Sequence, residues 1–168
     1  MALLVLSIFV IIIQRKSKSI STAALSSFLG RARRAVGLSG DVNVLITANQ
    51  HMRRLNQRFC RNDKPTDVLS FPSCELNGSR EKYAGDLAIS LEIAKENAQR
   101  LGHSLQEEIQ VLMLHGVLHL AGYDHECDDG EMARLEERLR SKLRLPTALI
   151  SRSDFKTRNG VTRQGKRR

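Results

Sequence analysis

The sequence is poor in aromatic residues: it contains no tryptophan, and phenylalanine and tyrosine together make up only 4% of its 168 positions. Proteins that bind single-stranded nucleic acid without sequence preference stack successive bases on aromatic side chains. A stacking platform of this kind is therefore poorly supported. Any affinity for RNA has to come from charge and shape.

Cysteine is also scarce. The chain has Cys60, Cys74 and Cys127, an odd number at irregular spacing. Small secreted domains that depend on disulfides usually carry an even number of cysteines. The pattern excludes a disulfide framework and suits a reducing compartment, and we expect Cys60 and Cys74 to be small buried fillers.

No apolar stretch is long enough to span a membrane. The first 13 residues, MALLVLSIFVIII, are largely apolar but then meet Gln14-Arg15-Lys16, whereas a transmembrane helix needs about 20 apolar residues. A secretory signal carries its basic residues before the apolar run, and here they follow it. We expect a buried first strand at residues 10–13 and an N-terminal extension at 1–9, for which a signal or anchor is the alternative. A cytoplasmic protein without a membrane partner is predicted.

The chain is long enough for one compact domain, with 41% hydrophobic residues to fill its core. Its net charge of +9 indicates an acidic polymer as partner. Residues 151–168 hold seven basic residues and one acidic residue, so the end of the chain carries most of this charge. We predict a domain at residues 10–146 and a disordered basic tail at 147–168.

Hydrophobic periodicity predicts strands interleaved with helices, followed by three helices in succession. This order is typical of a small α+β domain with helices packed on one mixed sheet. The helix that begins after Asn49 should turn Met52, Leu55 and Phe59 inward. The predicted strands are 10–13, 41–47, 66–71 and 83–90, and the predicted helices are 19–36, 49–59, 91–100, 104–121 and 130–143.

The helix at residues 104–121 is the most hydrophobic of the chain and has apolar residues on every side. A helix with this pattern is buried in the middle of a fold. Further on, Asp128 and Glu131 are spaced as a capping box, which predicts the start of the last helix.

The segment HGVLHLAGYDH, residues 115–125, carries the strongest chemical signal. His115 and His119 are four residues apart, so on a helix they project from one face about one turn apart. Gly122 can end the helix in a left-handed conformation and let His125 approach the same point. Three buried imidazoles without partners would each cost about 1–3 kcal/mol. One metal ion satisfies all three, and three nitrogen ligands with an open position are typical of catalytic zinc.

Two other uses of this spacing are a zinc protease and a structural zinc site. Zinc proteases with a similar pattern have a glutamate general base directly after the first histidine, and Gly116 occupies that position here. A purely structural zinc site would need a fourth ligand, for which Cys127 is the candidate, but no second cysteine flanks it. Both alternatives are less well supported than an open zinc site.

Three motifs, DKPTDVLSFP (63–72), GDLAIS (85–90) and HGVLHLAGYDH (115–125), together resemble the YbeY family of zinc-dependent endoribonucleases. The resemblance implies a four-stranded sheet covered by helices and one zinc ion, Zn²⁺, held by His115, His119 and His125. It also implies a single-strand-specific endoribonuclease acting in 16S rRNA 3′-end maturation and 70S ribosome quality control. Precursor 16S rRNA and the small ribosomal subunit with its associated proteins would be the partners.

The sequence departs from this family at one position. Members usually carry an arginine shortly before the DKPT motif, where it is expected to contact substrate phosphate, and here Cys60 occupies that place. Arg61 and Arg58 are the candidates to replace it, and Lys64 is a third cation for binding the phosphodiester. On a helix, an offset of one residue rotates the side chain by about 100°.

Asp124 lies between two of the histidines and could accept the Nδ1–H of one of them, or could simply form the turn after Gly122. We take Arg61 and Asp124 as candidate catalytic residues, with Arg58, Arg61 and Lys64 binding substrate. The functional alternative is a ribosome-biogenesis factor that binds RNA through its basic surface and has a structural zinc with little catalytic activity. The cysteine at position 60 is the feature that favours it.

Overall fold

The computed structural model describes residues 10–14, 19–73, 83–125 and 128–146. In this part of the chain, four strands form one sheet and five helices pack around it, so the predicted α+β class is confirmed. The predicted extension at 1–9 and the tail at 147–168 lie outside the described residues. The elements are β1 (Ile11–Ile13), α1 (Thr22–Val36), β2 (Asp41–Thr47), α2 (Asn49–Cys60), β3 (Val68–Pro72), β4 (Tyr83–Ser90), α3 (Leu91–Leu101), α4 (Leu105–Leu120) and α5 (Glu131–Leu143).

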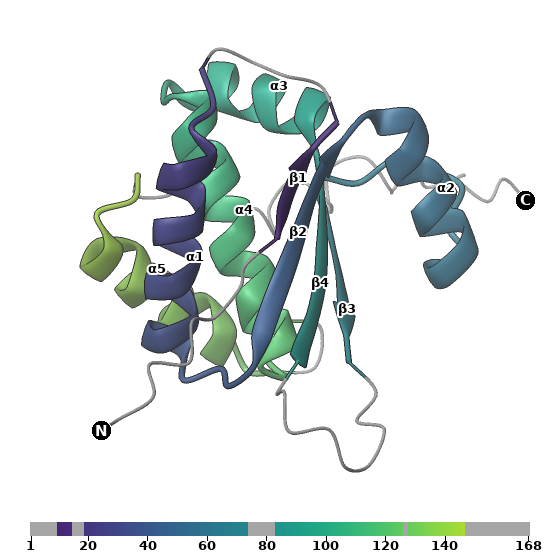
Figure 1. Ribbon diagram of the computed structural model, residues 1–168. Coiled ribbons are helices and arrows are strands. Elements are labelled where there is room, and N and C mark those ends of the chain that lie inside the picture. Colours follow the sequence, from purple (N-terminus) through teal and green to yellow (C-terminus); the bar gives the residue numbers. More distant parts are fainter. Residues whose placement is uncertain (1–9, 15–18, 74–82, 126–127, 147–168) are drawn as a thin grey trace, which may run out of the picture.

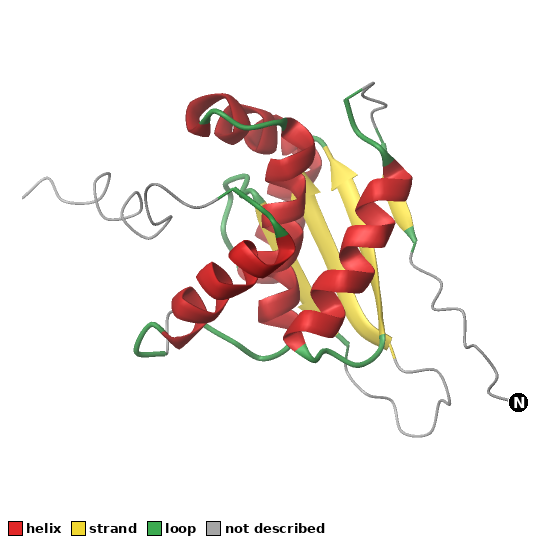
Figure 2. Ribbon diagram, turned by 90° about the vertical axis from the view of Figure 1, so that its left-hand side faces the viewer, coloured by secondary structure: helices red, strands yellow, loops and turns green. Residues whose placement is uncertain are grey.

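The sheet is mixed, with strand order β1-β2-β4-β3. β2 is parallel to both β1 and β4, and β3 is antiparallel to β4. Helices α1, α4 and α5 lie together on one side of the sheet, and α2 lies on the other side (Figure 1). Seen from the first of these sides, the helices lie in front of the strands (Figure 2). The core fills the space between the sheet and α1, α4 and α5.

Helix α4 lies in the middle of this core, as its apolar pattern predicted. Most of its residues are buried, and Ser104 and Glu107 form a capping box at its start. The helix comes so close to β4 that a Cβ on Gly116 would lie 2.7 Å from Leu87 Cδ2. The hydroxyl of Ser70 on β3 donates a hydrogen bond to the Gly116 carbonyl at 3.3 Å. The rotation of α4 about its axis is therefore fixed by the sheet.

Strands β2 and β4 have the bounds that the sequence predicted, but the first strand differs. Ile11 and Ile13 of the edge strand β1 pack against the core, but Val10 and Ile12 face the other side of the sheet and are 43% and 53% exposed rather than buried. The predicted capping box at the last helix is also wrong. Asp128 alone accepts the N–H groups of Gly130 and Met132, both at 2.8 Å, and Gly130 is the N-cap.

Helix α2 buries Met52 and Asn56, but its last turn is exposed. Phe59 faces the sheet as predicted, with its ring centroid 5.0 Å from that of Phe71 on β3, but it remains 57% exposed. Cys60 is exposed, so the prediction that it is a small buried filler was wrong. The physical reason is that, among the described elements, α2 lies alone on its side of the sheet, so none of them covers its C-terminal end (Figure 1). Cys74 lies outside the described residues. Among the described helices, none is long and apolar enough to cross a membrane.

Gly85 on β4 is the position where a side chain is least tolerable. Its φ is +144°, and a Cβ there would lie 2.3 Å from the Phe71 carbonyl oxygen. We predict that Gly85→Ala lowers the free energy of unfolding by at least about 3 kcal/mol, because backbone strain and a backbone clash add up. Urea unfolding followed by circular dichroism measures this.

Gly102→Ala is the matched control for Gly85→Ala. Gly102 also has a positive φ, +74°, but nothing lies within 4 Å of its Cβ position. The control should cost only about 1–2 kcal/mol, which is the strain of the left-handed backbone alone. Equal losses in the two variants would show that the contact with the Phe71 carbonyl has no effect.

Candidate metal centre

The structure brings His115, His119 and His125 together, as their spacing predicted. One ring nitrogen from each lies within 4.8 Å of the others. α4 holds the first two on one face, and the chain leaves the helix through Gly122, whose φ is +91°. The N–H of Tyr123 donates to the Leu118 carbonyl at 3.1 Å, which ties the turn back to the helix before His125.

The distances among the rings fit one metal ion. Nε2 of His115 and Nε2 of His119 are 3.2 Å apart. A tetrahedral zinc with bonds of 2.0–2.1 Å holds two nitrogen ligands about 3.4 Å apart. The ring centroids form a triangle with sides of 4.8, 5.7 and 5.3 Å. The donor set therefore suits zinc, in both its chemistry and the spacing of two of its atoms.

The environment of His119 favours the neutral ring that binds metal. Burial lowers its pKa, and the neighbouring His115 and His125 lower it further, against smaller opposing effects from a backbone hydrogen bond at Tyr123 and the charge of Asp124. His115 and His119 are half-buried and His125 is exposed, so the centre is open to solvent on the side of His125.

A carboxylate from α5, Glu136, contacts the first histidine. Its Oε2 lies 2.9 Å from His115 Nδ1. Its Oε1 accepts a hydrogen bond from Arg140 Nε at 3.0 Å and another from the same guanidinium. Burial would raise the pKa of Glu136, but the hydrogen bond and charge of His115, together with Arg140, outweigh it and lower the pKa to about 2. Glu136 is thus ionised, and sequence reasoning did not identify it or Arg140.

Asp124 was expected to be able to orient a histidine. For His115 this place is taken by Glu136. Asp124 is exposed, and its backbone carbonyl accepts the N–H of Asp128 at 3.1 Å, which fits the turn-forming alternative. Its charge acts on His119, whose pKa it raises slightly against the larger effect of burial.

The three cations expected to bind phosphate lie at the end of α2 and in the following loop, and all are exposed. Arg58 lies on the helix, with its guanidinium carbon 5.3 Å from the centre of the Phe59 ring. Cys60 is the last helical residue, and Arg61 follows in a left-handed conformation with φ of +56°. Arg61 therefore leaves the helix instead of continuing its rotation. Lys64 lies in the loop, where its carbonyl accepts from Asn56 Nδ2 at 2.7 Å.

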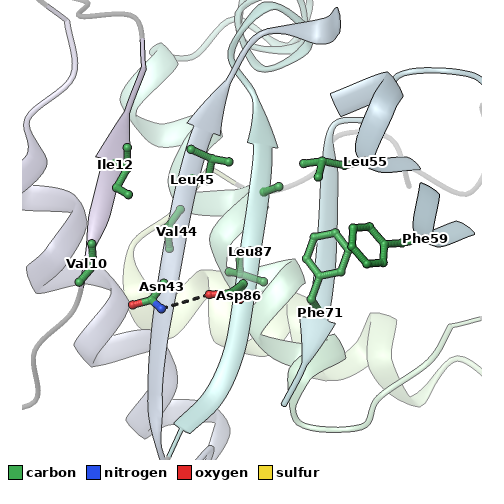
Figure 3. A pocket seen from close by; sticks show the side chains of 11 residues that line it. Val10, Ile12, Asn43, Val44, Leu45, Leu55, Phe59, Phe71, Asp86 and Leu87 are labelled. Atoms are coloured by element: carbon green, nitrogen blue, oxygen red, sulfur yellow. Dashed lines mark hydrogen bonds between the residues drawn. The ribbon is translucent and has the colours of Figure 1, made fainter. Parts of the chain in front are cut away.

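A groove of about 410 Å³ lies on the face of the sheet that carries α2 (Figure 3). The edge of Phe71 meets Phe59 there, with ring centroids 5.0 Å apart. Its polar end is formed by Asn43, which donates to Asp86 at 3.1 Å. Along β2, Asn43 and Leu45 line the groove and alternate with Val42 and Ile46, which face α1 and α4. The groove and the histidines are therefore on opposite faces of the sheet.

The structure also bears on the two alternatives to an open metal site, a zinc protease and a structural zinc site closed by Cys127. A Cβ at position 116 would lie 2.7 Å from Leu87 Cδ2 and 3.3 Å from Ser70 Oγ. The position holds a glycine and is crowded by these side chains, so the protease alternative lacks its catalytic glutamate. Cys127, the candidate fourth ligand of a structural zinc, lies outside the described residues.

Comparisons with known proteins agree with one another. A family model described as endoribonuclease YbeY matches residues 11–144. A protein of Koribacter versatilis named endoribonuclease YbeY is 52% identical over 154 residues, covering 92% of this chain and 98% of the relative. One of Solibacter usitatus with the same name is 46% identical over 139 residues, covering 83% and 90%. The solution structure of a Thermotoga maritima protein has a TM-score of 0.56 at 26% identity, covering 95% of this chain and 100% of that one.

Proposed function

This chain belongs to the endoribonuclease YbeY family, and from that premise we propose that it cleaves single-stranded RNA with one zinc ion held by His115, His119 and His125. The observation that carries this proposal is the convergence of three ring nitrogens within 4.8 Å at a point open to solvent. Imidazole nitrogens are typical zinc ligands, and three of them leave a coordination position for substrate or water.

Each part of the site has a role in this proposal. His115 and His119 present Nε2 from a rigid helix, and exposed His125 leaves one side accessible to a polymer. When bound, zinc supplies Lewis-acid stabilisation of the charge that develops on the phosphate. Asp124 stands beside the centre as an exposed carboxylate that could accept a proton. The nucleophile is either water or the 2′-hydroxyl of the RNA.

Arg58, Arg61 and Lys64 are proposed to bind the RNA backbone, with Arg61 also stabilising charge at the reacting phosphate. All three are exposed at one end of α2, where cations neutralise phosphates at little desolvation cost. We assign the activity to residues 10–146 and a supporting electrostatic role to the basic residues of 147–168. The chain as a whole has a net charge of +9, which favours a polyanionic substrate.

We propose the 3′ end of precursor 16S rRNA as the substrate, in maturation and in ribosome quality control in the cytoplasm. The small ribosomal subunit and its associated proteins would present this RNA. The support is the family membership together with the charge of the chain.

A second function, RNA binding with a structural zinc, is favoured by one observation. Cys60 stands where the family usually has its phosphate-binding arginine, and Arg61 leaves the helix in another direction. If neither Arg61 nor Arg58 reaches the reacting phosphate, charge stabilisation in the transition state is lost while binding remains.

Substituting one of the three histidines tests whether zinc binding and RNA cleavage depend on this site. We expect His119→Ala to lose stoichiometric zinc and to reduce cleavage of a labelled single-stranded RNA by at least about 100-fold, because two ligands hold zinc poorly. Elemental analysis and gel assays of the purified proteins measure this. His51→Ala, which removes a histidine whose Nδ1 contacts Thr47 Oγ1 at 3.1 Å, should keep both zinc and activity. Wild-type protein that carries zinc and binds the RNA without cleaving it would instead establish the binding factor.

Replacing the cations at the end of α2 tests whether they bind the RNA backbone. We predict that Arg58→Ala, Arg61→Ala and Lys64→Ala each weaken RNA binding and reduce the slope of log K against log salt by about 0.7 per lost phosphate contact. Fluorescence anisotropy at several salt concentrations measures the slope. Arg34→Ala, which removes an exposed cation from α1, is the control and should leave the slope unchanged. An equal loss in all four variants would mean that net charge alone, and not this site, binds RNA.

Restoring the family's residue tests whether the substitution at position 60 limits catalysis. We predict that Cys60→Arg raises the cleavage rate by about 10-fold, because one more guanidinium stabilises the transition state. Cys60 is exposed, so the larger side chain fits without repacking. Cys60→Lys is the control, since it adds the same charge without the bidentate geometry. Unchanged cleavage rates in both variants would show that Arg61 or Arg58 already stabilises the charge of the transition state.

A further inference from the structure

The contact chain from His115 through Glu136 to Arg140 joins the metal centre to the last helix. Both oxygens of Glu136 are engaged: Oε2 with His115 Nδ1 at 2.9 Å, and Oε1 with the Arg140 guanidinium, whose Nε is 3.0 Å away. Glu136 is 9% exposed and Arg140 is 7% exposed, so water does not compete for these contacts.

These contacts decide where the proton of His115 lies. An ionised carboxylate can only accept hydrogen bonds, so Nδ1 of His115 has to be the donor. To bind a metal, the His115 ring has to give up one proton; because Glu136 keeps the proton on Nδ1, the proton lost is the one on Nε2, which leaves the lone pair there. Nε2 is the atom that lies 3.2 Å from His119 Nε2, at the point where the three rings converge.

We propose that Glu136 is a positioning residue: it holds His115 in the Nδ1–H tautomer and in one ring orientation, and thereby sets the affinity of the centre for its metal. Arg140 holds the carboxylate in place by occupying its other oxygen. This inference rests on the proposed metal site and goes beyond it, because Glu136 acts through His115 and is not itself one of the three metal-binding residues.

The burial of the pair argues for this role over plain stabilisation. Buried ion pairs are often no more stabilising than apolar residues of the same volume, because desolvation costs as much as the attraction returns. The core between α4 and α5 is otherwise apolar at Met132, Leu139 and Leu143. A charged pair at this place is explained by what it contacts, which is a metal ligand.

The decisive variant is Glu136→Gln. Arg140 donates two hydrogen bonds and so will keep the amide oxygen, which leaves the amide NH₂ facing His115 Nδ1. Nδ1 then has to accept, the proton moves to Nε2, and the lone pair is no longer available to a metal. We expect zinc affinity to fall about 10- to 100-fold, as for other residues that orient a ligand. Competition with a chromophoric chelator measures the affinity on the full-length protein.

A double variant that also removes Arg140 should restore part of the zinc affinity. In Glu136→Gln/Arg140→Met the amide is free to turn, so its oxygen can again accept from Nδ1–H, and part of the affinity should return. Glu136→Leu/Arg140→Met has the same charge but no acceptor for Nδ1–H, so it should bind zinc less tightly than Glu136→Gln/Arg140→Met. Because both doubles remove the ion pair whole, their comparison decides the matter even if Glu136→Gln does not fold.

A second histidine–glutamate pair provides the matched control. Glu108 is fully buried and lies 2.8 Å from His103 Nε2, at the junction of α3 and α4. Glu108→Gln removes a contact of the same kind away from the three metal-binding histidines. It should lower the unfolding temperature while zinc affinity stays unchanged.

A metal-free measurement completes the test. Long-range ¹H–¹⁵N spectra of the protein without zinc should show a proton on Nδ1 of His115 in the wild type and on Nε2 in Glu136→Gln. Unchanged affinity and tautomer in Glu136→Gln would overturn the inference, as would equal affinities of the two double variants. Zinc binding by none of the proteins, wild type included, would overturn the proposed function instead, while the spectra still decide the tautomer.

Discussion

The close packing of α4 against the sheet is the constraint on which the rest of the structure depends. With no side chain at Gly116, the helix approaches Leu87 on β4 and accepts a hydrogen bond from Ser70 on β3. This contact fixes the rotation of α4, and the adjacent residue, His115, is then directed toward α5. Because α4 is apolar on its remaining faces, it has no other position in which its surface is buried equally well.

The parts of the fold that the sequence predicts well are those encoded locally. β2 and β4 alternate or run apolar between neighbours on both sides, so their bounds were predicted correctly. The three histidines converge because helical periodicity and one glycine turn suffice to bring them together. β1 and the end of α2 were misjudged because an apolar residue is buried only if another layer covers it. Neither the edge of the sheet nor the single helix on its second face can be read from a pattern.

The pair Glu136 and Arg140 could not be found from sequence for a related reason. In a helix, residues four apart with opposite charge usually form a solvated surface pair. Here the pair is buried instead, because α5 packs on α4 and places Glu136 beside His115, which lies 21 residues earlier in the chain. The three metal-binding histidines can thus be identified from one segment of the sequence. The orientation of His115, however, depends on the packing of α5 against α4.

The crowding at Gly116 also bears on what this scaffold can become. Proteases that bind zinc through the same histidine spacing need a carboxylate one residue after the first ligand. Here that position faces the interior, where Leu87 and Ser70 leave no room even for a methyl group. A glutamate at this position would therefore require the side chains of Leu87 and Ser70 to shift, in a part of the core where Leu87 is 1% exposed. The packing of α4 against the sheet thus adds a repacking cost to one evolutionary route while leaving the metal ligands unchanged.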